Sequence, residues 1–293
     1  MATSSAGLYK RVDWKPFTRV FRLNGGLHLE LGSRTLIMGI LNVTPDSFSD
    51  GGLYTSVDAA VERAAAMVEE GADIIDVGGE STRPGHVPVP AEAELERVIP
   101  VIRELRRVLP HVPISIDTYK AQVAREAVKA GAHIINDVWG TLADEEMAAA
   151  AAELDCPIVL MHNRKEAVYR DLVREVCEDL RTCVRRAQAA GVRTENIILD
   201  PGIGFGKTYE HNLQLMGRLY EVVEMGYPVL LGTSRKSMIR TTLGLPADDV
   251  VEGTAATVAF GIAQGCQIMR VHDVKAIRRT ARMMDALVYA ERT

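Results

Sequence analysis

The chain has 293 residues and a formal net charge of -5, with 47% hydrophobic and 5% aromatic residues. This balance excludes a general binder of nucleic acid or of anionic membranes, so any anionic ligand must be held by a local group of Arg and Lys. No apolar run reaches membrane-spanning length, and the first residues lack the apolar core of a signal peptide. We therefore expect a cytoplasmic protein without a membrane or nucleic-acid partner.

The four cysteines show neither a CxxC pair nor the spacing of metal ligands. Cys156 and Cys266 open apolar, strand-like runs, so we interpret them as small buried hydrophobic residues. The cysteine pattern therefore predicts no disulfide framework and no metal site.

The first predicted element is a β-hairpin over residues 21–29. Its turn falls at Asn24-Gly25, a pair typical of tight hairpin turns. Such a hairpin could close the bottom of a barrel. Residues 1–20 match no specific pattern and are treated as an N-terminal extension, followed by one domain over residues 21–293.

From residue 36 onward, continuous apolar strands alternate with Ala-rich helices, and Gly71, Gly131 and similar glycines end the helices. This pattern indicates parallel strands covered on both sides. The predicted strands are 36–41, 74–77, 113–117, 134–136, 157–161, 197–200, 229–232 and 268–271. The predicted helices are 56–70, 91–109, 119–130, 143–154, 166–190, 208–225, 250–264 and 273–290. Eight such units predict an α/β fold, a (β/α)8 TIM barrel with an N-terminal β-hairpin; a doubly wound open sheet is the alternative.

Polar residues stand where the predicted strands end, which is where TIM barrels carry their chemistry. Two carboxylates and an amide at such ends suit a flat heterocycle, because a carboxylate accepts two parallel hydrogen bonds from an amino-pyrimidine edge. Each residue could instead be a helix cap, and Asp117-Thr118 in particular resembles one. The strand-end residues are Asn42, Asp117, Asn136, His162, Asp200, Ser234, Arg270 and His272.

Two loops after strands are long and rich in reactive side chains. The loop after Asn42 carries Asp46, Ser47, Ser49 and Asp50. The loop over residues 76–85 carries Thr82 and Arg83, and an Arg there can clamp phosphate. An exposed turn is the alternative for each loop.

Three later segments complete the candidate site. Residues 200–208 form a Gly-rich loop in which Phe205 could stack on a flat ligand; the spacing before Gly206-Lys207 does not match a P-loop. In residues 232–237 a strand ends and a short helix is predicted to begin, so that backbone N–H groups and Lys236 could receive a carboxylate or a carbonyl. Strand alternation points Arg270 and His272 to one side as a diphosphate site; the alternative is an Arg held by core carboxylates.

From about Arg34 to its end, the chain resembles dihydropteroate synthase. The segments Gly-Ile-Leu-Asn-Val-Thr-Pro-Asp-Ser-Phe-Ser-Asp from Gly39 and Asp-Val-Gly-Gly-Glu-Ser-Thr-Arg-Pro-Gly from Asp76 are long and specific. The resemblance implies a transferase that condenses 6-hydroxymethyl-7,8-dihydropterin diphosphate with para-aminobenzoate, giving 7,8-dihydropteroate and diphosphate with Mg²⁺ as cofactor. It also implies a homodimer through the last helices and a sulfonamide target.

The resemblance assigns a role to each matching position. The positions expected to bind the pterin are Asp117, Asn136, Asp200 and Lys236. Those for the diphosphate are Asn42, Arg270 and His272, with Asn42 on the metal. Those for para-aminobenzoate are Thr82, Arg83, Phe205 and Ser237. The catalytic set is Asp50, Arg83, Lys236, Arg270 and His272.

One departure from the family follows Met161-His162, where the chain reads Asn163-Arg164-Lys165-Glu166 and is predicted to pass directly into a helix. This weakens any role assigned to that loop. Two other functions stay open. A binding domain for methyltetrahydrofolate would need no diphosphate clamp, and a non-catalytic paralogue would show erosion in the two long loops, which the sequence does not.

Overall fold

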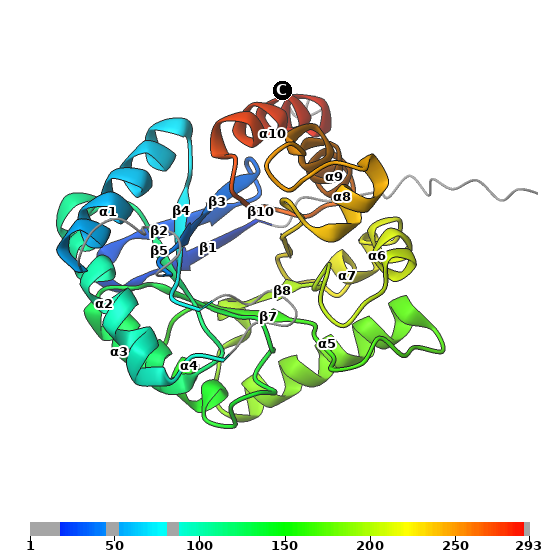
Figure 1. The fold of residues 1–293 in the computed structure, drawn as a ribbon. Coiled ribbons are helices and arrows are strands. Elements are labelled where there is room, and N and C mark those ends of the chain that lie inside the picture. Colours follow the sequence, from blue (N-terminus) through cyan, green and yellow to red (C-terminus); the bar gives the residue numbers. More distant parts are fainter. Residues whose placement is uncertain (1–17, 45–52, 81–87, 290–293) are drawn as a thin grey trace, which may run out of the picture.

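Eight parallel strands form a barrel in the computed structural model, which describes residues 18–44, 53–80 and 88–289 (Figure 1). The sheet order is β8-β7-β6-β5-β4-β3-β10-β9. A parallel bridge between Leu199 and Val229 joins its two edge strands and closes the barrel. The predicted TIM barrel is therefore confirmed, and the open-sheet alternative is wrong. The barrel strands are β3 Leu36–Asn42, β4 Ile74–Gly78, β5 Ile114–Asp117, β6 Ile134–Asp137, β7 Ile158–Met161, β8 Ile197–Asp200, β9 Leu230–Leu231 and β10 Ile268–Val271.

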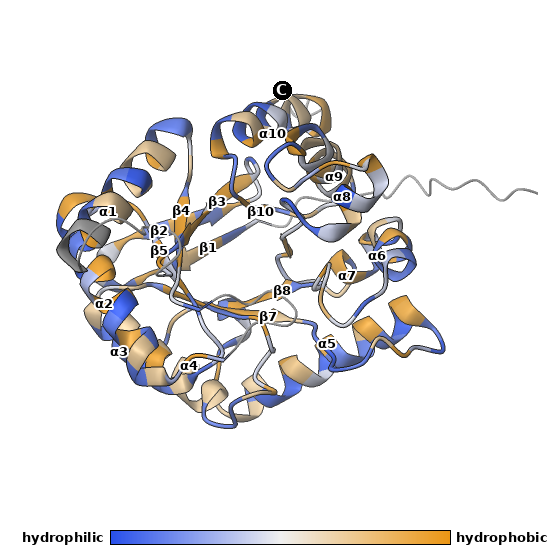
Figure 2. Ribbon diagram, viewed as in Figure 1, coloured by the Kyte–Doolittle hydropathy of each residue, from blue (hydrophilic) through white to orange (hydrophobic). Residues whose placement is uncertain are grey.

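Helices cover the outside of the barrel, while the strands are mostly hydrophobic (Figure 2). Outward strand residues such as Ile37, Ile75 and Ile116 pack in the same buried cluster as helix residues. No helix within the described ranges is long and apolar enough to cross a membrane. The helices are α1 Leu53–Glu70, α2 Ala91–Val108, α3 Ala121–Ala130, α4 Met147–Leu154, α5 Leu172–Ala189, α6 Tyr209–Met216, α7 Tyr220–Val223, α8 Ser237–Leu243, α9 Val251–Ala263 and α10 Val274–Val288.

Two helix predictions need correction. The helix predicted over 166–190 begins only at Leu172, because the side chain of Asp171 accepts a hydrogen bond from Arg174 N and caps its start. The chain therefore does not pass directly from the strand into a helix; residues 163–171 form a loop. The helix predicted over 208–225 is interrupted after Met216 and divides into α6 and the short α7.

The predicted N-terminal hairpin is confirmed. Strands β1 (Arg19–Arg22) and β2 (His28–Leu31) are antiparallel, and the turn between them contains Gly25 in a left-handed conformation, with φ of 72°. Alternate hairpin residues pack against the inward residues at the amino ends of the barrel strands, so the hairpin closes this end. The cluster contains Phe21, Leu23, Leu29, Leu31, Leu36, Met38, Ile74, Ile134, Val159, Ile198, Leu230 and Ile268.

The same alternation places polar residues inside the barrel at its carboxyl end. On β4, inward Ile74 is followed two residues later by Asp76, and on β10 inward Ile268 is followed by Arg270. The strand register pairs Gly78 with both Asn42 and Asp117, and Asp117 in turn with Asn136. This register brings three of the residues expected to bind the pterin and diphosphate, Asn42, Asp117 and Asn136, to corresponding positions at the carboxyl end of the barrel.

Candidate active site

Arg270 lies at the centre of the polar end of the barrel. Its Nε donates to Asp76 Oδ2 at 2.6 Å, and its Nη2 donates to Asp117 Oδ2 at 2.5 Å. Asn136 Nδ2 donates to the same Asp76 oxygen at 3.1 Å. One guanidinium therefore links β10 to β4 and β5. This contact pattern matches the alternative considered for Arg270, an Arg held by core carboxylates.

Burial changes the pKa values of the charged groups in this cluster. Burial raises the pKa of Asp117 to about 7, although Arg270 lowers it; the neighbouring Asp76 adds to the rise. Burial also lowers the pKa of Arg270, but Asp76 and Asp117 more than offset this and raise it. Within the described ranges, Asp76 Oδ1, Asp117 Oδ1 and Ser115 Oγ are buried without a hydrogen-bond partner. Such atoms can receive donors from a bound heterocycle.

The helix-cap interpretation of Asp117 is wrong. Helix α3 begins at Ala121, after Lys120, and the N–H of Ala121 donates to Asp144 Oδ2 at 2.8 Å. Asp117 instead points into the barrel, toward Arg270.

A second charged pair occupies the side of β8. Asp200 Oδ1 accepts from Gly202 N at 2.7 Å. Burial raises the pKa of Asp200, and Lys236 opposes that rise. Lys236 Nζ donates to Ile203 O and lies 4.5 Å from the centre of the Phe205 ring. Burial lowers the pKa of Lys236 to about 8, against the attraction of Asp200. The structure thus brings Lys236 close to Phe205 and within electrostatic reach of Asp200.

Two glycines allow this close approach. Gly202 and Gly204 have φ of 68° and 85°, where side chains are disfavoured. A Cβ on Gly202 would lie 1.9 Å from His162 O, and one on Gly204 would lie 2.9 Å from Lys236 Cδ. The Gly-rich loop is therefore required by packing at these two positions.

His272 lies at the rim with Ser234. Ser234 Oγ accepts from His272 N at 3.1 Å and lies 3.0 Å from His272 Nδ1. Because the backbone N–H fills one lone pair, the hydroxyl can turn its own proton toward Nδ1. Arg270 is held deeper, by Asp76 and Asp117. The two predicted diphosphate residues thus have different partners.

The other predicted residues divide into those that the structure describes and those that it does not. A Cβ on Gly78 would lie 3.6 Å from Asp117 Oδ2 and 3.8 Å from Asn42 Oδ1, so both side chains flank Gly78. Ser237 is exposed and opens α8 directly after Lys236. The remaining predictions, Asp50, Thr82 and Arg83, lie outside the described residues.

Sequence reasoning missed Asp76 as a site residue. It is fully buried and accepts hydrogen bonds from both Arg270 and Asn136. The signal was present: Asp76 is the one charged residue in the run Ile74-Ile75-Asp76-Val77-Gly78, and it shares the inward alternation of Ile74. A charge at an inward position of a buried strand needs a partner, which here is Arg270.

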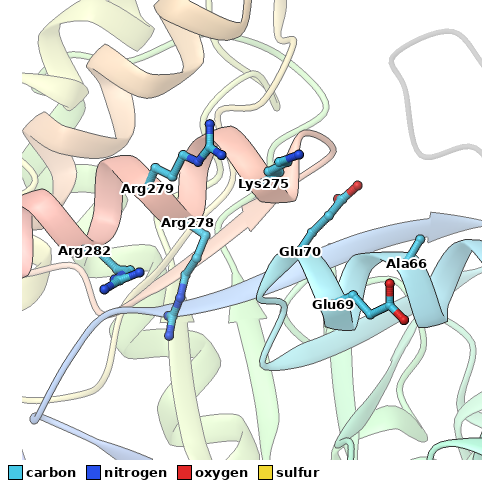
Figure 3. Close-up of a pocket in the computed structure, with 7 residues that line it drawn as sticks. All are labelled: Ala66, Glu69, Glu70, Lys275, Arg278, Arg279 and Arg282. Carbon is cyan, nitrogen blue, oxygen red and sulfur yellow. The ribbon is translucent and has the colours of Figure 1, made fainter.

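A hollow of about 440 Å³ lies elsewhere, between α1 and α10 (Figure 3). Glu69 and Glu70 line it at the C-terminal end of α1. All of its lining residues belong to these two helices on the outside of the barrel, whereas the candidate site lies inside the barrel. The hollow is therefore separate from the candidate site. The facing side chains on α10 are Lys275, Arg278, Arg279 and Arg282.

Comparison with known proteins defines the class. The model of the family described as "Pterin binding enzyme" matches residues 38–272. A dihydropteroate synthase of Bacillus subtilis is 58% identical over 260 residues, covering 89% of this chain and 91% of the relative. A dihydropteroate synthase structure from Clostridium difficile, solved with pteroic acid, has 50% identity and a TM-score of 0.87, covering 88% of this chain and 98% of that chain. One from Xanthomonas albilineans, in complex with 7,8-dihydropteroate, has 41% identity and a TM-score of 0.84, covering 92% and 98%.

The closed barrel has carboxylates at its open end, and the chain matches the pterin-binding family model. Together these two findings define a pterin-binding TIM-barrel enzyme. Within that class, the chain belongs to the dihydropteroate synthase family. It is a transferase that condenses 6-hydroxymethyl-7,8-dihydropterin diphosphate with para-aminobenzoate to give 7,8-dihydropteroate and diphosphate. The family and its activity, expected from the motifs, are confirmed.

Proposed function

We propose that Asp117, Asn136, Asp200 and Lys236 bind the pterin. The observation that carries this proposal is the pair of buried carboxylate oxygens, Asp76 Oδ1 and Asp117 Oδ1, which lack a partner within the described ranges. A pterin offers an amino group and ring N–H donors on one edge, and carboxylates accept such donors in parallel. Across the barrel, Lys236 supplies a cation that can donate to the heterocycle's carbonyl oxygen.

Asn42, Arg270 and His272 are proposed to hold the diphosphate. Arg270 is buried and positively charged, and two carboxylates hold it at the polar end of the barrel, where it can stabilise charge on a leaving group. When substrate arrives, Arg270 can exchange part of its pairing with Asp117 for a phosphate oxygen. Asp117 then loses a cationic neighbour, which favours its protonated form.

Mg²⁺ is proposed as the cofactor, and the residues present fit it. Mg²⁺ prefers oxygen ligands and is usually held by few protein groups together with substrate phosphates. Asn42 offers an amide oxygen, and it flanks Gly78 as the Asp117 carboxylate does. The described residues contain no cluster of three His, Cys, Asp or Glu side chains suited to a metal, so the substrate would supply most of the ligands. The ion would neutralise charge on the departing diphosphate.

The arylamine is proposed to bind beside Phe205 and Ser237, with Thr82 and Arg83 contributing from the β4–α2 loop. Phe205 offers a ring face next to the Lys236 ammonium, and Ser237 offers an exposed hydroxyl directly after that lysine. In this proposal, the amine would lie near the carbon from which diphosphate departs. Asp50 belongs to the proposed catalytic set on the loop after β3. A sulfonamide, as an arylamine mimic, is proposed to compete for this position.

The test is diphosphate release by the purified protein with pterin diphosphate, para-aminobenzoate and Mg²⁺, each omitted in turn. Release that needs all three, with dihydropteroate formed and a sulfonamide competing only with the arylamine, supports the proposed site. Asp200→Asn should weaken pterin binding about 10- to 100-fold in calorimetry, because a charged acceptor is lost. Unchanged binding would contradict the pterin assignment, whereas binding without arylamine-dependent release would indicate a non-catalytic paralogue.

A homodimer through α9 and α10 is also proposed. Helix α9 reads Val-Glu-Gly-Thr-Ala-Ala-Thr-Val-Ala-Phe-Gly-Ile-Ala and carries few polar residues. On α10, Met283 and Leu287 are 59% and 61% exposed and lie one helical turn apart. Light scattering should give twice the chain mass, and Leu287→Arg should give the monomer. Val168→Arg, at an equally exposed apolar residue on the β7–α5 loop, is the control and should leave the mass unchanged.

The remaining proposals concern location and domain boundaries. All four cysteines are free and buried, which is compatible with a reducing, cytoplasmic compartment. A division into an extension over residues 1–20 and a pterin-binding domain over residues 21–293 is retained as a proposal.

A further inference from the structure

The Lys207 ammonium is enclosed at the base of the loop between β8 and α6. It donates to Gly202 O at 2.8 Å and Phe205 O at 3.0 Å, both in its own loop, and to His162 Nδ1 at 2.7 Å. An ammonium has three protons, so all three are used. Burial lowers its pKa to about 7, and the positive charge of Lys236 contributes. A lysine in this setting needs a reason, because removing its charge from water is unfavourable.

The partner side chain, His162, is held in one tautomer. Its ring is fully buried, and Nε2 lies 3.2 Å from Asp179 Oδ2 on α5. Since Nδ1 accepts from Lys207, the ring proton must be on Nε2, which donates to Asp179. Burial lowers the pKa of His162 to about 4, so the ring stays neutral near pH 7. Asp179 is fixed in turn by Arg164 Nε at 2.7 Å.

The loop held by Lys207 also shapes the proposed arylamine position. Its carbonyl groups turn in two directions: Gly202 O and Phe205 O bind Lys207, whereas Ile203 O binds Lys236. Gly206 O accepts from Tyr169 OH at 2.7 Å, which comes from the loop before α5. Two lysines and a tyrosine therefore determine where the Phe205 ring lies.

We propose that Lys207, anchored by His162 and Asp179, is a positioning residue that holds the Phe205 ring in place for the arylamine. This inference rests on the proposed arylamine position. Lys207 needs no contact with substrate to act in this way. The β7–α5 loop departs from the family in sequence, which weakened any role assigned to it, but it supports the same structure through Arg164 and Tyr169.

The test separates the two substrates. Lys207→Met should raise KM for para-aminobenzoate about tenfold, the equivalent of 1.4 kcal/mol. KM for the pterin diphosphate should change less than about threefold, because Asp117 and Asn136 lie on regular strands outside this loop. An equal rise in both constants, or none, would overturn the proposal. A loss of thermal stability with both constants unchanged would indicate a purely structural lysine and would also overturn it.

A matched pair at position 162 keeps the test decisive even if Lys207→Met does not fold. The His162→Gln amide can accept from Lys207 and donate to Asp179, so it should retain KM for the arylamine within about threefold. His162→Leu can do neither and should reproduce the Lys207→Met effect. Equal constants in the two variants would refute the anchoring of Lys207 by His162. If wild-type protein releases diphosphate without para-aminobenzoate, the proposed function fails. If wild-type protein requires para-aminobenzoate but these variants keep the wild-type KM values, the inference alone fails.

Discussion

The two ends of the barrel interior are built from the same strands but have opposite character. At the amino end, inward residues such as Met38 and Ile74 pack against Phe21 and Leu31 of the hairpin. At the carboxyl end, the next inward position on β4 is Asp76, which pairs with Arg270. Burying apolar surface therefore stabilises the fold at one end, whereas enclosing charge at the other end reduces that stability.

This contrast indicates that the amino ends of the strands stabilise the barrel, while their carboxyl ends carry the site. Apolar burial at the plugged end stabilises the barrel by about 25 cal/mol for each Å² removed from water. The open end keeps unpartnered buried oxygens on Asp76 and Asp117 within the described ranges. Such groups reduce stability unless a ligand satisfies them, which is why they mark the site. Substitutions at the plugged end should therefore affect stability alone, whereas substitutions at the open end should also affect activity.

The largest effect is expected for Arg270→Ala at the open end. Turnover should fall about 10³-fold, because a preorganised cation is lost where negative charge develops. Stability should also fall by about 3 kcal/mol, since Asp76 and Asp117 lose their buried partner. Steady-state assays and urea unfolding measure the two effects.

Arg174→Ala is the matched control for this arginine. Its ion pair with Glu178 is exposed on α5, so the change should alter neither activity nor, by more than about 0.5 kcal/mol, stability. Normal turnover in the Arg270→Ala variant would exclude Arg270 from the diphosphate site.

At the plugged end, Phe21→Ala should affect stability alone. Phe21 is 1% exposed, and removing a buried aromatic ring costs about 3 to 5 kcal/mol. The value of kcat/KM per folded molecule should stay unchanged, as measured at low temperature on protein verified as folded by circular dichroism. Val20→Ala, at the neighbouring residue with 48% exposure, should change stability far less. A fall in kcat/KM without unfolding would mean that the two ends are coupled.

The smallest effect is a pH dependence at the open end. Burial lowers the pKa of Lys236 to about 8, so its ammonium loses its proton as pH rises through 8. Wild-type protein should bind the pterin about tenfold more tightly than Lys236→Met at pH 7, and this advantage should shrink above pH 8. The ratio of the two affinities removes the titration of Asp117 and Lys207, which both proteins share. A constant ratio from pH 7 to 9.5 would contradict the role of the Lys236 charge.

Much of the fold was predictable because its signals are local. Strands such as 197–200 were bounded by apolar runs and turn residues, and Asn24-Gly25 marked the hairpin turn. Helix boundaries were less secure, as at α5, where the predicted start preceded the observed Leu172 by six residues. That start depends on the Asp171 cap and on Arg164, which pairs with Asp179 and Glu175. Such contacts form only after the chain has folded.

The sequence by itself determined which side chains enter the barrel, because a strand alternates its side chains with a period of two. The ends of the predicted strands indicated Asp117, Asn136 and Asp200 as candidates, and the family motifs supplied their expected roles. The tertiary structure alone decided which charges meet. Arg270 pairs with Asp76 and Asp117 across separations of 194 and 153 residues. Barrel closure brings these groups into one buried space, where each charge must be neutralised by a neighbour that local sequence does not specify.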